Sequence, residues 1–233
     1  MTRLDPQLVL HGYASGIFPM AERRDTDELF WVEPRERAIL PIGGFHLSRS
    51  LARRLRSGRF HVTRDRDFAG VLEGCADRDE TWINPPIARA MADLHSVGAA
   101  HSMEVWREGR LVGGIYGVKL GRAFFGESMF SRETDASKVA LAWLVARLKV
   151  GGFELLDCQF ITDHLASLGA VVVSRKRYSA LLAAALGAGR EAVRRDEPAA
   201  EFAALDELLS ARGLAGADGP SGKVIAQLLT HTS

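Results

Sequence analysis

The feature that most constrains the fold is a change of residue pattern after residue 100. Three runs rich in β-branched and aromatic residues, 101–106, 110–118 and 122–130, follow one another closely. The breaks between them, Glu108-Gly109 and Lys119-Leu120-Gly121, are typical of hairpin turns. Tight turns of this kind join antiparallel strands, and so the pattern predicts a three-stranded antiparallel meander.

Helices and strands alternate after the meander. The sequence predicts a helix over 136–149, a strand over 153–159, a short helix over 162–168 and a strand over 170–174. The fold class is therefore α+β with a mixed, mainly antiparallel sheet. This order resembles the GNAT type of acyltransferase. The glycine-rich loop that binds the coenzyme A pyrophosphate in that architecture is missing at 131–138, and so coenzyme A is not the expected acyl donor.

The flanking sequence divides the chain into three predicted parts. We expect a small N-terminal lobe over 1–60, a GNAT-like catalytic domain over 61–182 and an Ala-rich helical extension over 183–233. The first part is irregular, with short apolar pieces between turn residues. In the second, a strand near 60–63, an amphipathic piece over 67–75 and a helix over 86–97 precede the meander.

Charge is balanced overall but not along the chain. The whole sequence holds 30 Lys+Arg and 29 Asp+Glu, whereas residues 1–66 hold 12 Arg and 8 acidic residues. Residues 48–56 are predicted as a helix that Ser48 caps, with Arg49, Arg53 and Arg56 on one face. Such a face can bind phosphates. An ordinary solvated face fits the same spacing and is the better explanation from spacing alone.

The sequence contains no signal for a disulfide framework, a metal site, a serine-nucleophile motif, secretion or a membrane span. Cys75 and Cys158 have no metal-ligand spacing with histidine and suggest no disulfide framework. Neither a metal motif nor a Gly-x-Ser-x-Gly nucleophile motif occurs. No signal-peptide stretch begins the sequence, and no run approaches the roughly 20 apolar residues that cross a bilayer. We expect a cytoplasmic protein with no metal and no membrane partner.

Glu127 stands in an unusual setting. On a regular strand it shares one face with Phe125 and Met129. A carboxylate among apolar side chains is unfavourable to bury without a partner. It would either receive a cationic group, such as a substrate amine, or form a structural ion pair with an arginine.

Asp157 and Gln159 form a second candidate pair at the end of an apolar strand. Their i, i+2 spacing sends both side chains from the same face, with Cys158 on the other. The carboxylate would orient the amide, whose oxygen would accept a hydrogen from an attacking amine. A helix cap or turn is the alternative for Asp157, and Cys158 is interpreted as a buried apolar residue.

Motifs spread over about residues 11–182 carry a family resemblance. They include Gly16-Ile17-Phe18-Pro19, Phe45-His46-Leu47-Ser48-Arg49-Ser50-Leu51, Thr81-Trp82-Ile83, His101-Ser102-Met103-Glu104-Val105-Trp106, Gly126-Glu127-Ser128-Met129-Phe130-Ser131 and Asp157-Cys158-Gln159. Each tripeptide is weak evidence, but the ordered set is specific. With them the sequence resembles the leucyl/phenylalanyl-tRNA–protein transferases, bacterial enzymes of the N-degron pathway.

This resemblance implies an activity and a set of site residues. Such an enzyme moves Leu or Phe, and Met less well, from aminoacyl-tRNA to the α-amino group of proteins that begin with Arg or Lys, and it needs no metal or coenzyme. Asp157 and Gln159 match the family's catalytic pair, and Glu127 matches an acidic residue near the amine. The tRNA-binding positions match Arg49, Arg53 and Arg56. The aminoacyl pocket maps to Trp82, Ile115, Phe124, Met129, Trp143 and Leu148.

One departure bears on specificity. Met20 follows the Gly16-Ile17-Phe18-Pro19 motif, where well-known members have a Trp in the pocket wall, so Met20 is added to the predicted pocket. Core packing is the alternative for the mapped apolar residues, most of all for Trp143 and Leu148. Two other functions stay open at this point: a coenzyme A-dependent GNAT-type N-acyltransferase, and a tRNA-binding module without catalysis.

Overall fold

A seven-stranded sheet forms the centre of the molecule. The computed structural model describes residues 4–187, 200–214 and 219–230. The sheet order is β4-β5-β6-β7-β8-β3-β9. Its strands are β3 (Glu36–Ile39), β4 (His61–Arg64), β5 (Ala100–Arg107), β6 (Arg110–Leu120), β7 (Ala123–Ser131), β8 (Leu155–Gln159) and β9 (Val171–Ser174). Only β7 and β8 pair in parallel within these ranges, which confirms the mixed, mainly antiparallel sheet.

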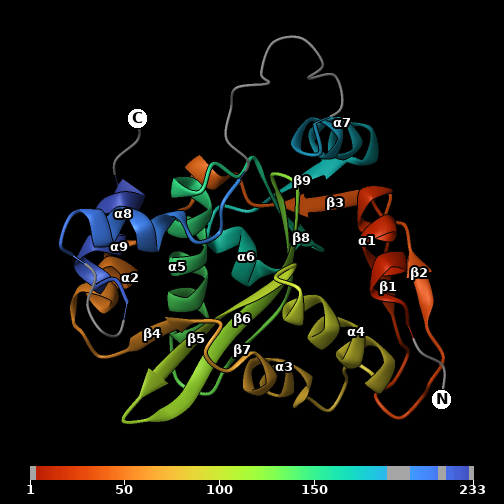
Figure 1. Cartoon of the computed structure of the whole chain (residues 1–233), viewed down its shortest axis with the longest axis horizontal. Helices are drawn as coiled ribbons and strands as arrows, with labels where there is room; N and C mark the ends of the chain where they lie inside the picture. The colour runs from red at the N-terminus through yellow and green to blue at the C-terminus, as the bar shows by residue number, and fades with distance from the viewer. Residues whose placement is uncertain (1–3, 188–199, 215–218, 231–233) are drawn as a thin grey trace.

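Helices cover both faces of this sheet (Figure 1). On one side lie α2 (Arg49–Arg56), α5 (Ala136–Val150), α8 (Ala204–Ala211) and α9 (Gly222–Thr230). On the other side lie α1 (Pro6–Ala14), α3 (Phe68–Ala76) and α4 (Pro85–Ser96). The remaining helices are α6 (Asp163–Ser167) after β8 and α7 (Arg175–Ala185) after β9, with a 3-10 turn at Ile42–Gly44.

Local sequence explains where several helices begin. Ser48, Asn84 and Thr162 precede α2, α4 and α6, and each side chain accepts a hydrogen bond from a backbone N–H of the first turn. The expected cap at Ser48 is therefore confirmed. The predicted ranges of the meander, α5, α6 and β9 agree with the structure to within two residues.

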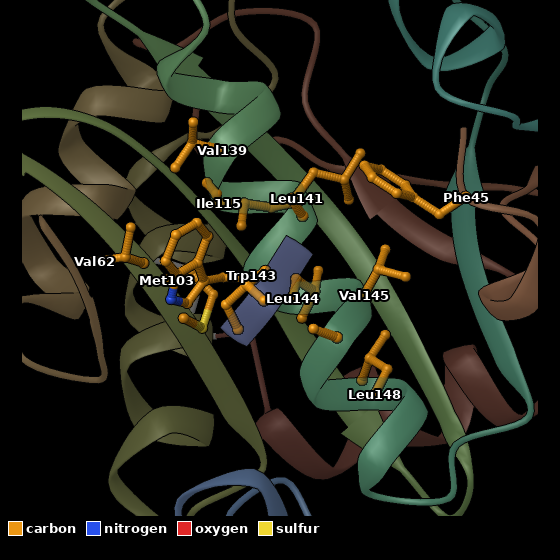
Figure 2. Close-up of a cluster of buried hydrophobic side chains, with 14 of the residues drawn as sticks. Phe45, Val62, Met103, Ile115, Val139, Leu141, Trp143, Leu144, Val145 and Leu148 are labelled. Carbon is orange, nitrogen blue, oxygen red and sulfur yellow. The ribbon is translucent and has the colours of Figure 1, made fainter. Parts of the chain in front are cut away.

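Helix α5 is mostly apolar and is buried along most of its length, with Arg147 as a charged exception. Figure 2 shows its side chains Val139, Leu141, Trp143, Leu144, Val145 and Leu148 among Phe45, Val62, Met103 and Ile115. Helices α8 and α9 cover α5 with Leu205, Leu209 and Ile225. A helix that is hydrophobic all round belongs in a core, and the 183–233 extension supplies part of that core.

The first 60 residues contain more order than the sequence suggested. Strands β1 (Phe18–Met20) and β2 (Phe30–Val32) form a small two-stranded sheet, and β3 lies inside the central sheet between β8 and β9. Helix α7 was also not anticipated. The division at residues 60 and 182 stays a prediction. Strand β3 belongs to the first part by sequence and to the central sheet by pairing, and residues 188–199 and 215–218 lie outside the described ranges.

A β-bulge changes which side chains share a face of β7. Tyr116 pairs with Ser128, but Gly117 pairs with Gly126, which leaves Glu127 as an extra residue. Phe124 and Met129 consequently pack with the core on the α5 side, whereas Phe125 and Phe130 pack with the opposite one. The predicted regular alternation, with Phe125 and Met129 on one face, is therefore wrong, because the bulge shifts the pattern by one residue.

Candidate functional site

Glu127, Asp157 and Gln159 lie together because two neighbouring strands carry them. Strands β7 and β8 pair in parallel, with Phe125 opposite Asp157. The bulge in β7 turns Glu127 toward the end of β8, where the side-chain amide of Gln159 donates to Glu127 Oε1 at 3.0 Å. The three predicted catalytic residues thus form one cluster, in which Glu127 is 6% exposed and Asp157 is fully buried.

Two carboxylates bind two different amides of Gln159. Its backbone N–H donates to Asp157 Oδ1 at 2.7 Å, while its side chain binds Glu127. The backbone of Gln159 has φ +61°, a left-handed conformation that is uncommon for a residue with a side chain. The sequence-based relay, in which Asp157 orients the side-chain amide, is therefore changed: Glu127 orients this amide, and Asp157 holds the backbone.

Arg37, which was not among the predicted site residues, binds both carboxylate oxygens of Asp157. Arg37 on β3 donates from Nε to both carboxylate oxygens at 3.0 Å, and from Nη2 to Oδ2 at 2.6 Å. Tyr178 on α7 donates its hydroxyl to the same Oδ2 at 2.7 Å. Burial lowers the pKa of Arg37, but the hydrogen bonds and charge of Asp157 more than offset this, so its pKa is raised and it stays charged.

Arg37 also joins the N-terminal segment to the site. Its Nη1 donates to the carbonyl of Gly16 at 3.1 Å, and its guanidinium lies 4.5 Å from the Phe18 ring centre and 4.7 Å from that of Tyr178. Gly16 has φ +80°, which glycine adopts readily. In the sequence, Arg37 stands directly before the apolar Ala38-Ile39-Leu40, and this position is the signal that could have selected it as a candidate.

The charge state of Glu127 is set mainly by burial. Desolvation raises its pKa to about 7, and the negative charge of Asp157 acts in the same direction. The Tyr13 hydroxyl, the Gln159 amide and the charge of Arg37 oppose this rise. Glu127 Oε2 and Tyr13 Oη are buried, and neither has a partner with hydrogen-bond geometry among the described residues. The carboxylate oxygen that Gln159 does not bind therefore has no hydrogen bond of good geometry, although Tyr13 lies close enough to Glu127 to lower its pKa.

The cluster opens into a cavity of about 300 Å³. Gln159 and Glu127 lie in its wall with Ser128 and Thr162. Its apolar wall consists of Trp82, Ile115, Met129, Leu141, Leu156 and Leu165. An apolar cavity with a few polar groups at one side is the usual form of a small-ligand site. Three predicted pocket residues, Trp82, Ile115 and Met129, line it.

The other four predicted pocket residues lie elsewhere. Phe124 stacks on Phe202 with ring centres 5.4 Å apart. Trp143 and Leu148 are buried in the core around α5, as their alternative interpretation held (Figure 2). Met20 lies on β1 and packs against the core on the opposite side of the sheet. None of these four side chains is in the wall of the cavity beside Gln159.

A second hollow of about 300 Å³ adjoins the first. The two share Arg78, Met129 and His164 as wall residues. The second hollow also contains Arg132 and the start of α5 at Ser137. Two arginines and the N-terminal end of a long helix favour negative charge there, although Asp77 also lines the hollow and pairs with Arg132 at 3.4 Å.

The predicted basic face on α2 is open to solvent. Arg49, Arg53 and Arg56 are exposed, whereas Leu51 and Leu55 on the same helix are buried. Arg54 points elsewhere and pairs with Asp135 at 3.3 Å. Within the described residues, the structure gives Arg49, Arg53 and Arg56 no ion pair. Three unpaired arginines on one face can bind phosphates, but their role stays a prediction.

Other candidate chemistry has little support. Burial raises the pKa of the Cys158 thiol to about 12, so it stays protonated rather than acting as a nucleophile. Among the described residues, no group of three or more His, Cys, Asp or Glu side chains could hold a metal ion. No helix in the described parts of the chain has the length and apolar character to span a membrane.

Comparison with known proteins identifies the family. The model of the "Leucyl/phenylalanyl-tRNA protein transferase" family matches residues 39–183, and the model of its N-terminal domain matches residues 2–35. The chain belongs to this family. It is 57% identical to the leucyl/phenylalanyl-tRNA–protein transferase of Rhizorhabdus wittichii, with all of both chains covered. It is 59% identical to that of Ruegeria pomeroyi, with 99% of each covered.

Membership of this family makes the chain an aminoacyltransferase, as the sequence motifs suggested. The family's N-terminal model ends at residue 35, directly before β3. Similar solved structures are more distant. L-PGS from Bacillus licheniformis is 10% identical at a TM-score of 0.38, covering 77% of this chain and 70% of that one. A GCN5-related N-acetyltransferase-like protein from Streptococcus suis is 16% identical at 0.34, covering 72% and 64%.

Proposed function

We propose that the chain transfers Leu or Phe, and Met less well, from aminoacyl-tRNA to the α-amino group of proteins that begin with Arg or Lys. The observation that carries this proposal is the cluster of Glu127 and Gln159 at the polar side of an apolar cavity. In the reaction, the amine nitrogen attacks the ester carbonyl, a C–N bond forms and the bond to the tRNA 3′ oxygen breaks. One amine proton must reach that oxygen.

Each polar residue has a defined task in this scheme. A carboxylate only accepts hydrogen bonds, so ionised Glu127 turns the Nε2 side of Gln159 toward itself and leaves the amide oxygen for the amine. An amide oxygen orients the amine but is a weak base. Glu127 also lies in the cavity wall, and its pKa of about 7 suits it to take the proton and return it to the leaving oxygen.

The two hollows suggest how the donor lies. The apolar cavity would hold the Leu or Phe side chain against Trp82, Ile115 and Met129. The adjoining hollow, with Arg78 and Arg132, would hold the 3′ end of the tRNA, and the basic face of α2 would contact its acceptor arm. The family resemblance supplies the acceptor class, and a buried carboxylate with a free oxygen is compatible with a cationic N-terminus.

This function places the reaction in the cytoplasm, where aminoacyl-tRNA is available, and makes the product a substrate of the N-degron pathway. The test is transfer of labelled Leu from Leu-tRNA to peptides that differ only in their first residue. We expect transfer to Arg- and Lys-peptides and none to an Ala-peptide. Transfer from an acyl-coenzyme A, or no transfer from Leu-tRNA, would contradict the proposal.

A further inference from the structure

Asp157 does not reach the reacting groups. It is fully buried and does not lie in the wall of the cavity, whereas its neighbours Leu156, Cys158 and Gln159 do. Its carboxylate accepts from Arg37 Nε and Nη2, from the Tyr178 hydroxyl and from the Gln159 backbone N–H. Donors thus already occupy both carboxylate oxygens.

The four donor groups belong to three residues that lie on three different elements of the fold. Arg37 is on β3, Tyr178 on α7 and Gln159 at the end of β8. Arg37 is 2% exposed and additionally binds the Gly16 carbonyl, with its guanidinium between the rings of Phe18 and Tyr178. Several contacts therefore hold the Asp157 carboxylate and the Arg37 guanidinium, so that their orientation does not depend on a single hydrogen bond.

These contacts hold the backbone of Gln159 in its uncommon left-handed conformation. Left-handed backbone at a residue with a side chain persists only where the surroundings enforce it. Here Asp157 Oδ1 accepts the Gln159 N–H at 2.7 Å, and the side-chain amide then meets Glu127 Oε1 at 3.0 Å. A rotation of this backbone would move the amide oxygen away from the amine.

We propose that Arg37 and Tyr178 are positioning residues for aminoacyl transfer: they fix the Asp157 carboxylate, which fixes the left-handed backbone of Gln159 and so aims its amide at the acceptor amine. This inference rests on the proposed function. Asp157 acts through Gln159 and not on the substrate. The N-terminal segment takes part because Gly16 and Phe18 contact Arg37 directly.

The test compares Arg37→Met with Arg147→Met. Arg147 is also buried, on α5, and binds Asp206 through two nitrogen atoms, but it does not lie in the wall of the reaction cavity. Both variants are assayed at saturating Leu-tRNA with an Arg-peptide, alongside the folded fraction and tRNA affinity. We expect Arg37→Met to lower kcat about 100-fold, because small misplacements of reacting groups have effects of that order. Arg147→Met lowers the melting temperature but leaves kcat per folded molecule within about twofold.

Two further variants separate a loss of kcat from a loss of folding if Arg37→Met folds poorly. Tyr178→Phe removes one hydrogen bond to Asp157 and keeps the ring on Arg37, and we expect kcat to fall about three- to tenfold with little change in KM for Leu-tRNA. The double variant Arg37→Met/Asp157→Asn leaves no orphaned charge, so it should regain stability while its kcat stays low.

The pH profile adds a readout that a stability change does not move. The titratable and polar groups around Glu127 are Arg37, Asp157, Gln159, Tyr13, Tyr116 and Tyr178, and the positive charge of Arg37 favours its ionised form. The acid limb of kcat/KM should therefore move to higher pH in Arg37→Met and stay in place in Arg147→Met. A wild-type kcat in folded Arg37→Met or in the double variant would overturn the inference, as would an equal kcat loss in Arg147→Met. Absence of transfer by the wild-type protein would instead overturn the proposed function.

Discussion

Two buried arginines in this molecule form similar ion pairs with different consequences. Arg37 binds Asp157 beneath the cavity, where the arginine is 2% exposed and the aspartate is fully buried. Arg147 binds Asp206 on α8, where the arginine is 1% exposed but the aspartate is 36% exposed. Arg147 also donates to the Phe202 carbonyl, so this pair fastens the C-terminal extension to α5. The first pair adjoins the candidate site, and the second joins two layers.

Burial of the arginine alone therefore does not separate the two pairs. What separates the two pairs is what else their carboxylates bind. Asp157 binds the backbone of Gln159, whose side chain lines the cavity. Asp206 binds Arg64 at 3.2 Å, a residue near the surface.

Removing the two aspartates should separate the pairs most strongly. Asp157→Ala leaves Arg37 buried without a counter-charge, and we expect it to reduce the free energy of unfolding by about 3–5 kcal/mol. It should also lower transfer at least about 100-fold, with tRNA binding nearly unchanged. Asp206→Ala should reduce the unfolding free energy by only about 1–2 kcal/mol, because water reaches that pair. Urea unfolding measures the change in stability, and single-turnover assays measure the change in transfer. An equal loss of transfer in the two variants would contradict the different roles of the two ion pairs.

Glu127 offers a test of a buried carboxylate that has no arginine bound to it. Because its pKa rises from 4.5 in the unfolded chain to about 7 in the folded protein, the folded state binds a proton more tightly. The wild type should therefore lose stability relative to Glu127→Gln as pH rises from about 4.5 to 7, by about 3 kcal/mol in total. Urea unfolding of both proteins at pH 4.5 and pH 8 measures this difference. A pH-independent difference would show that the carboxyl is not perturbed by burial.

The arginines of α2 represent the opposite case, exposed and without an ion pair in the described chain. Replacing Arg49, Arg53 and Arg56 with Gln should leave folding unchanged within about 0.5 kcal/mol, since surface substitutions have small effects. It should weaken tRNA binding about tenfold and reduce its salt dependence by up to about one unit of slope for each phosphate that the variant no longer binds. Titrations at several salt concentrations give the slope. The matched variant Arg23→Gln, at an exposed loop position paired with Asp25, should leave the slope unchanged.

Local patterns predicted much of the fold and selected three residues, Glu127, Asp157 and Gln159, that the structure brings together. The meander and α5 were predictable because their strand alternation, turns and glycine stops are local signals. Strand β3 was not, because four residues that include Glu36 and Arg37 show no strand pattern, and its pairing with β8 joins residues far apart in sequence. Arg37 and Tyr178 became visible only once this pairing brought them to Asp157.

The predicted site differs from the structure in part for the same physical reason. The bulge at Glu127 and the left-handed backbone at Gln159 depend on tertiary contacts, so regular strand geometry misassigned their neighbours. Trp143 and Leu148 are large and apolar like the residues that line the cavity, and composition cannot distinguish a cavity wall from a core.

The contacts of Arg37 also restrict when the site can assemble. Gly16, Arg37, Asp157 and Tyr178 must all be in place before Gln159 is held, and they span most of the described chain. Contacts between residues so distant in sequence form late in folding, because closing long loops is slow. During synthesis, we therefore expect Gln159 to be held in this conformation only after α7 has left the ribosome.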